Sequence, residues 1–533
     1  MIGVVDGNGT GRSWLGPLPL PPSRKGRGRR VLEVLGFCAA LCIPQHAAHA
    51  QKSADTLRVV WRDALPNVDP YFNSARTGLI VAHHAFDTLL QRDPDTFQLK
   101  PLLAQSWKWI DDKTLEFALR QNVRFHNGDP VTSADVVYTL NTISSPETRV
   151  SVPSNSAWID RAEAIDQHTV RIHTKTVFPA AVECLAMALP IWPKAYRERV
   201  GADDYAKQPI GAGPYRITRV DGVREIDLER FDDYYPDSPK GRPAIRRIVI
   251  KEVAEEATQV TMLLGNQADW IWYFNADNFD NINRMPTLQA VRAESMRYGL
   301  ISLDAAGRTG AGNPLTNLKV RQAIFYAIDR ATIAKQLVQG GAHALDAPCY
   351  PSQFGCDQGA AVHYDYDPAK AKQLLAEAGF PNGVDTEFVT GLLPQWATAI
   401  QNYLAAVGIR ARLTIMVGGA ATKRQLDGSS PMYGNAWGSY SINDVSANLP
   451  YFFSGDAVDY ARDAEVTRLV REGSSVTDPD ARRKAYSAAI HRITEQAFFL
   501  PLWSYSTTYA FSRALEFRAW PDELPRFYLS RWK

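Results

Sequence analysis

The clearest alternation of hydrophobic and polar residues lies at 115–120, where Leu115, Phe117 and Leu119 are separated by polar or small residues. A period of two is typical of a strand with one buried face. Asn127-Gly128 then predicts a turn, because both residues tolerate positive φ. Thr132, with an Asp three residues later, predicts the start of a helix. The stretch therefore predicts a strand, a turn and a helix in that order.

Helical and strand patterns alternate again in the second half of the chain. Hydrophobic residues at helical spacing predict one helix over 317–341, which ends at a Gly-Gly pair. Helices at 369–379 and 396–408 follow, and the second leads into an alternating strand at 409–417. Helix followed by strand, repeated, predicts an α/β lobe with covered sheets.

The first fifty residues have the pattern of a secretory signal peptide. Basic residues at 24–30 precede a short apolar run at 31–44, and Ala48-His49-Ala50 offers a cleavage site. The stretch before residue 24 is long for a signal peptide, which indicates that the true start codon lies further along the chain. Cys38 and Cys42 lie in or near the apolar run but lack the small residues that precede a lipid-attachment site. We therefore expect a free periplasmic protein without a lipid anchor.

Charge and length narrow the class of protein further. The whole chain has a net charge of +2, but the leader holds six basic and two acidic residues, so the mature chain is slightly negative. A near-neutral surface argues against a nucleic-acid partner, which needs a clustered basic face. The length predicts roughly three domain-sized units, or two lobes of which one carries an insertion.

Cysteines and histidines give the remaining candidate chemistry. Cys349 and Cys356 are separated by turn-forming residues, and an oxidising compartment favours a disulfide between them. A metal site is the alternative, but the sequence lacks a second Cys/His pair at suitable spacing. Cys184 would then be a lone, buried thiol. His83 and His84 point apart on a helix, which predicts surface or cap histidines.

Several stretches resemble one family closely. PLLAQSWKWIDD (101–112) and LEFALRQNVRFHNGDPVTSADVVYTL (115–140) resemble the signature region of the extracytoplasmic solute-binding proteins, family 5, of ABC importers. GAGPYRI (211–217) and VRQAIFYAIDR (320–330) are also similar. This family includes peptide-, nickel- and opine-binding proteins. The resemblance implies an α/β, two-lobed, periplasmic-binding-protein-like fold of type II, in the large cluster with an extra domain inserted in lobe one.

The resemblance also implies a division of the chain. A leader at 1–50 precedes lobe one, which takes 51–302 and 503–533 and contains an inserted subdomain at about 96–208. Lobe two takes 303–502. Two connections between the lobes would form the hinge.

By the same resemblance, we expect a periplasmic receptor that captures peptides and delivers them to an ABC permease. It would be a monomer that needs no cofactor or metal, because ATP acts on other subunits. The alternatives are the same transport role for a non-peptide solute, such as an opine, a sugar conjugate or a metal chelate, or a secreted hydrolase. Against a hydrolase, the chain has no nucleophile elbow, HExxH motif or Ser-His pair with motif context.

The expected ligand site centres on 437–453. Peptide binders of the family stack ligand on a tryptophan, which matches Trp437, and hold the α-ammonium with an Asp three residues later. This chain has Tyr440 there. The hypothesis is that Asp444, with Asn443 beside it, replaces that carboxylate. Further expected site residues, at strand ends facing the same cleft, are Trp61, Asp63 and Tyr298. We expect Trp270 and Trp272 to lie in the core.

Overall fold

The structure, a computed structural model, describes residues 55–533 except 66, 223, 417 and 439–441. The expected leader and Tyr440 lie outside the described residues. None of the helices in the described part of the chain has both the length and the apolar character that spanning a membrane requires.

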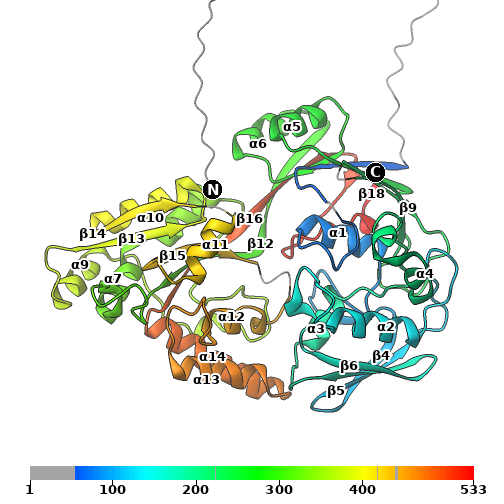
Figure 1. Ribbon diagram of the computed structural model, residues 1–533. Coiled ribbons are helices and arrows are strands. Elements are labelled where there is room, and N and C mark those ends of the chain that lie inside the picture. The colour runs from blue at the N-terminus through cyan, green and yellow to red at the C-terminus, as the bar shows by residue number, and fades with distance from the viewer. Residues whose placement is uncertain (1–54, 66, 223, 417, 439–441) are drawn as a thin grey trace, which may run out of the picture. The chain divides into compact units, whose positions relative to one another are not determined.

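One ten-stranded sheet organises the described chain (Figure 1). Its strands, in spatial order, are β14 (Ile409–Ile415), β13 (Val384–Thr390), β15 (Met432–Trp437), β12 (Leu288–Leu303), β16 (Phe499–Ser512), β11 (Trp270–Trp272), β1 (Thr56–Trp61), β10 (Arg247–Glu252), β9 (Glu225–Arg230) and β8 (Tyr215–Asp221). The two longest strands, β12 and β16, pair antiparallel in the middle of the sheet. They therefore join the strands on either side into one continuous sheet.

Three smaller sheets complete the strand inventory of the described residues. A four-stranded sheet consists of β4 (Ala104–Asp111), β5 (Thr114–Leu119), β7 (Thr169–Thr174) and β6 (Ile159–Asp166). Two-stranded sheets pair β2 (Leu90–Arg92) with β3 (Leu99–Pro101), and β17 (Leu515–Glu516) with β18 (Arg531–Trp532). The four-stranded sheet falls inside the stretch expected as an inserted subdomain, and the division into lobes remains our prediction.

Helices flank these sheets. Before β12, the chain forms α1 (Arg76–Ala85), α2 (Ser133–Ser144), α3 (Ala181–Met187), α4 (Lys194–Tyr205), α5 (Glu256–Leu264) and α6 (Phe279–Asn283). The second half forms α7 (Leu318–Ala327), α8 (Arg330–Ile333), α9 (Pro368–Glu377), α10 (Pro394–Ala406), α11 (Gly418–Leu426), α12 (Leu449–Phe453), α13 (Ala464–Ser474) and α14 (Pro479–Glu495). Because α10 packs on β14 and α7 on α9, helices and strands share one core there.

The first predicted strand and helix are confirmed. Leu115, Phe117 and Leu119 are buried on β5. At the start of α2, the backbone N–H and the hydroxyl of Thr132 both donate to Asp135 at 2.9 Å. This contact forms the predicted capping box. Trp270 and Trp272 are buried, as predicted.

The single helix predicted over 317–341 is wrong. The chain leaves helical geometry after α7, and the Asp329 side chain caps α8 by accepting the Thr332 N–H. The break lets the buried Arg330 guanidinium donate to the carbonyl oxygens of Leu345, Pro501 and Tyr364. Hydrophobic periodicity gives no sign of these contacts with distant parts of the chain.

His84 also departs from its prediction, because it is buried instead of lying at the surface. Its Nδ1 lies 2.7 Å from the Ile80 carbonyl, and its Nε2 accepts the Phe527 N–H at 3.0 Å. Nδ1 must therefore carry the ring proton, and a second proton on Nε2 would meet a donor. Burial lowers the pKa of His84 to about 3, with only partial compensation by the Ile80 carbonyl.

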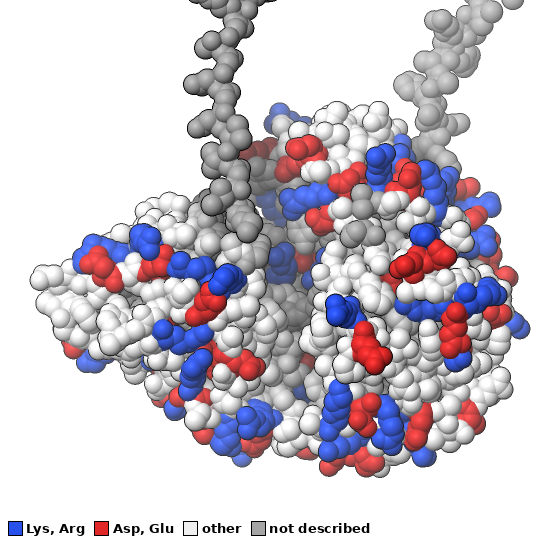
Figure 2. All heavy atoms as spheres, in the orientation of Figure 1, with Lys and Arg blue, Asp and Glu red and all other residues white. Residues whose placement is uncertain are grey.

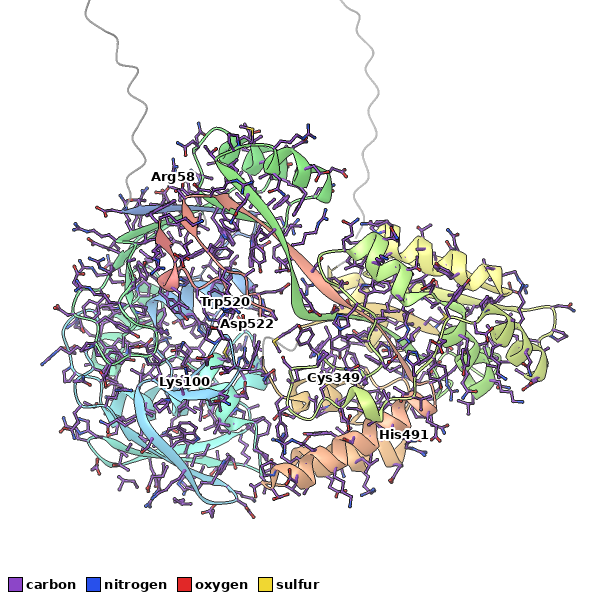
Figure 3. The ribbon with its side chains drawn as sticks, turned by 180° about the vertical axis from the view of Figure 1, so that it is seen from behind. Arg58, Lys100, Cys349, His491, Trp520 and Asp522 are labelled. Carbon is purple, nitrogen blue, oxygen red and sulfur yellow. A yellow bond between two sulfur atoms is a disulfide. The ribbon has the colours of Figure 1, made fainter. Side chains whose placement is uncertain are left out.

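This histidine predicts a loss of stability in acid. Between its ordinary pKa near 6.5 and about 3, the unfolded chain binds a proton at His84 that the folded chain does not. The free energy of unfolding should fall by about 2 kcal/mol between pH 8 and pH 5 from this group alone. Urea unfolding at both pH values should show a smaller difference for His84→Gln than for wild type. The control His491→Gln, at an exposed position on α14 (Figure 3), should keep the wild-type difference.

Candidate ligand-binding cleft

A cleft of about 1550 Å³ opens along the middle of the ten-stranded sheet. Its lining comes from the loop after β1, the start of α1, strands β12 and β16, the end of β15 and the α12 region. Residues far apart in the sequence therefore meet on one surface. Two groups of lining residues bear most directly on ligand chemistry.

One part is apolar, and we call it the apolar wall: Leu337, Leu393, Trp396, Trp437 and Tyr451. Trp437 ends β15 and stacks on Tyr451 with ring centroids 4.5 Å apart. Leu337, Leu393 and Tyr451 are 40%, 48% and 40% exposed, although they are large and hydrophobic. Large apolar side chains that stay exposed in a concave site favour ligand contact.

The other part carries four arginines, and we call it the arginine set: Arg62, Arg76, Arg292 and Arg297. All four arginines precede residue 304. Among the described residues from 337 to 456 that line the cleft, Asp456 is the one charged residue. Guanidinium groups bind carboxylates through paired hydrogen bonds. The arginine set therefore fits an anionic ligand group.

Glu523 lies beside two of these arginines and is buried. Its Oε1 accepts the Thr507 hydroxyl at 2.6 Å, and its Oε2 lies 3.8 Å from Nη2 of Arg76. Oδ2 of the neighbouring Asp522 accepts hydrogen bonds from the guanidinium groups of Arg92 and Arg526 (Figure 3). This C-terminal segment supplies acidic charge to the arginine-lined side of the cleft.

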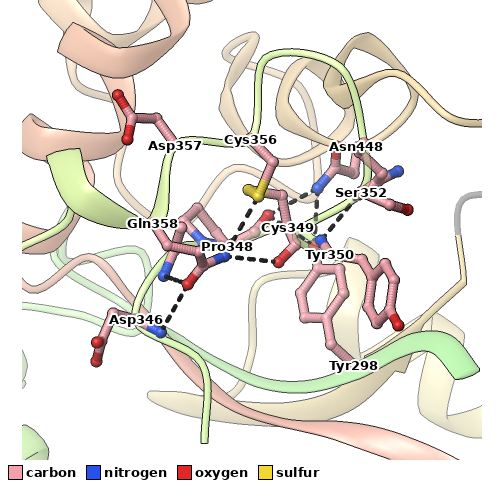
Figure 4. The surroundings of a disulfide bond; sticks show 12 residues. Tyr298, Asp346, Pro348, Cys349, Tyr350, Ser352, Cys356, Asp357, Gln358 and Asn448 are labelled. Atoms are coloured by element: carbon pink, nitrogen blue, oxygen red, sulfur yellow. Dashed lines mark hydrogen bonds between the residues drawn. A yellow bond between two sulfur atoms is a disulfide. The ribbon is translucent and has the colours of Figure 1, made fainter. Parts of the chain in front are cut away.

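The structure places two of the expected site residues, Trp437 and Asp63, in the cleft lining. Trp61 is instead buried in the core, with its ring centroid 6.4 Å from that of Trp272. Tyr298 is also buried, where its hydroxyl donates to the Pro348 carbonyl at 3.0 Å and accepts from Asn448 at 2.9 Å (Figure 4). Neither lines the cleft.

Asp444 does not face the cleft, which corrects the hypothesis that it is a free anchor. Its two oxygens accept Nη2 of Arg482 at 2.9 and 2.8 Å, and Oδ1 also accepts the Ser446 N–H. The Asp444 and Arg482 side chains are 4% and 6% exposed. Asp444 therefore attaches its loop to α14, since a buried guanidinium needs a carboxylate partner.

Asn443 is buried beside it and does not line the cleft either. Its N–H donates to Oε2 of Glu183 at 3.2 Å, and its Oδ1 accepts the Ser352 hydroxyl at 3.2 Å. Because Glu183 lies on α3 and also pairs with Arg92, Asn443 joins the cleft loop to the first half of the chain.

Cys349 and Cys356 form a disulfide (Figure 4). The enclosed loop pairs with the cleft segment, because the Phe354 N–H donates to Asn443 and the Val445 N–H donates to Phe354. Cys184 is buried, as predicted, and burial raises the pKa of its thiol to about 12. No group of three or more metal-ligating side chains occurs among the residues that the structure describes.

Sequence reasoning did not find Arg76, Arg292, Arg297 or Glu523. One available signal was the run of charged residues in β12, Arg292, Glu294 and Arg297, which interrupts a mostly buried strand. Charged residues are rarely placed in such strands without a partner or a ligand.

Comparison with known proteins gives the family. The model of bacterial extracellular solute-binding proteins, family 5 (Middle), matches residues 98–459. The glutathione-binding protein GsiB of Pectobacterium atrosepticum is 30% identical over 402 residues, covering 73% of this chain and 74% of that protein.

Solved structures share the fold. HbpA2 of Haemophilus parasuis superposes with a TM-score of 0.78 at 22% identity, covering 90% of this chain and all of that one. AgaA of A. tumefacien R10, solved with agropinic acid, gives 0.70 at 25% identity, covering 90% of this chain and 99% of that one. These matches confirm the predicted two-lobed α/β fold class. The chain belongs to the bacterial extracellular solute-binding proteins, family 5, and is a solute-binding receptor of an ABC importer and not an enzyme.

Proposed function

We propose that this receptor captures a small peptide with at least one free carboxylate and delivers it to its permease. The observation that carries the proposal is the two-part lining of the cleft, with the arginine set on one part and the apolar wall on the other. The relative named for glutathione, a peptide with two carboxylates, supports the same ligand class.

The physical reason lies in desolvation. A carboxylate that leaves water for a cleft loses hydration, and only an ionic or multiply hydrogen-bonded partner compensates that loss. The arginine set supplies such donors, while Trp437 and Tyr451 provide flat apolar surface for the rest of the ligand. The cleft volume of about 1550 Å³ exceeds what one amino acid needs, so a peptide of several residues with bridging water fits.

An opine is the second candidate. Opines also carry carboxylates, and AgaA was solved with agropinic acid. The placement of Asp444 against Arg482 favours this candidate, because a ligand without an α-ammonium needs no such anchor. Trp437 and the arginine set would contact either ligand.

The signal-peptide pattern supports a periplasmic location without a lipid anchor, and we propose a monomer without a nucleic-acid partner. Figure 2 shows Lys and Arg interspersed with Asp and Glu over the visible face. This face, with charges of mixed sign, lacks the basic stripe that nucleic acid needs.

Mass spectrometry of small molecules released by denaturing the purified protein tests the ligand class directly. Calorimetric titration with glutathione, the tetrapeptide Ser-Thr-Ser-Ala and agropinic acid then gives affinities. We expect a peptide to bind in the micromolar range or tighter. Release or binding of agropinic acid alone would replace the peptide by the opine, and hydrolysis of a bound peptide would contradict a receptor.

A further inference from the structure

A β-bulge brings Arg297 to the cleft. The register between β12 and β16 shifts between Ser295 and Tyr298, so the residues between them leave the regular ladder. The Met296 N–H instead donates to the Pro521 carbonyl at 2.7 Å. Bulges bend a strand and re-aim its side chains, often next to functional sites. Here the bulge places Arg297 in the cleft lining beside the segment that carries Glu523.

Arg76 and Arg297 converge on one point next to Trp437. A Cβ added to Gly438 would lie 3.0 Å from Cγ of Arg297 and 3.6 Å from Nη2 of Arg76. The two arginines come from α1 and β12, whereas Gly438 directly follows β15. A residue without a side chain therefore leaves room beside the aliphatic part of Arg297, the Arg76 guanidinium and the stacking tryptophan.

The charge of Arg297 is compensated only at a distance. Glu523 is the carboxylate near both arginines, and Arg297 forms no ion pair within 4.0 Å with any described carboxylate. The Arg297 guanidinium lies over the Tyr505 ring, 5.2 Å from its centroid. Burial would lower the pKa of Arg297, but Glu523, Tyr273 and Tyr505 outweigh it and raise that pKa. Arg297 thus presents to the cleft a positive charge that no described carboxylate approaches within 4.0 Å.

Resting on the proposed function, we propose that Arg297 and Arg76 form the subsite for a ligand carboxylate, against Gly438 and Trp437. Glu523 supplies part of the counter-charge. A ligand carboxylate would accept hydrogen bonds from both guanidinium groups and would give Arg297 a close anionic partner.

The test is a calorimetric comparison of glutathione with its diethyl ester, in which both carboxylates are blocked. Wild type should bind the acid at least 10-fold more tightly than the ester. Arg297→Gln should weaken glutathione binding at least 10-fold and leave acid and ester within about 3-fold of each other. Arg284→Gln is the matched control, since Arg284 is an exposed arginine outside the cleft lining. It should keep the wild-type preference.

Arg76→Gln gives an independent second variant if Arg297→Gln folds poorly, as judged by its melting temperature. Glu523→Gln should tighten glutathione binding at least 3-fold, because the ligand no longer competes with that carboxylate for the two arginines. The same variant should lower the melting temperature. A purely structural Glu523 would lower the melting temperature without tightening binding. If wild type binds glutathione and both arginine variants keep its acid-over-ester preference, this inference fails alone. If wild type binds no peptide, both the proposed function and this inference are contradicted.

Discussion

Asp444→Ala should lower the free energy of unfolding by about 3–5 kcal/mol, because it leaves the Arg482 guanidinium buried without its carboxylate. The loss also removes the acceptor for the Ser446 N–H and loosens the loop from α14. Chemical denaturation followed by tryptophan fluorescence measures it. Asp456→Asn, at an exposed position of the cleft lining, is the control and should change stability by less than about 0.5 kcal/mol.

A further variant, Asp444→Asn, separates a structural Asp444 from a ligand anchor. Asp444→Asn keeps the size of the side chain but removes its charge, so it should also destabilise the fold. Reduced affinity for a cationic ligand with unchanged stability would contradict the buried ion pair and restore the anchor hypothesis.

Trp437→Ala should weaken peptide binding roughly 30-fold, about 2 kcal/mol, which is the usual cost of truncating an aromatic residue at the centre of a binding surface. The reason is that Trp437 faces the cleft and stacks on Tyr451, so its removal takes away flat ligand-contact area. Titration of the purified variant with the peptide that wild type binds gives the change in affinity.

The control for this second variant is Trp109→Ala. Trp109 is also partly buried but lies on β4, outside the cleft lining. Its loss should affect stability and leave affinity unchanged. If Trp437→Ala binds the peptide as tightly as wild type, Trp437 does not belong to the site.

Local features were predictable from the sequence. The alternation at 115–120 and the Thr132–Asp135 cap depend on neighbours within a few residues, so periodicity and capping rules find them. The break between α7 and α8 depends on carbonyl groups such as that of Pro501, far along the chain. No local pattern reports such a partner, and the helix was therefore predicted as continuous.

The site was predictable only in part, and mainly through family resemblance. Resemblance found Trp437, but it also led to Asp444, whose partner Arg482 lies 38 residues further on. Spacing alone cannot tell whether a carboxylate meets a ligand or a buried arginine. Arg297 and Arg76 were missed because a bulge and the sheet order bring them together, and neither is visible in hydrophobic periodicity.

The position of β12 and β16 in the chain has a consequence for how specificity can change. Every member of the arginine set, together with Glu523, lies outside residues 304–498, and every member of the apolar wall lies inside them. Exchange of that internal stretch between family members would replace the apolar wall and retain the arginine set. The two shared strands would keep their pairing. Recombination at two points would therefore change the apolar wall while the arginine set stays as it is.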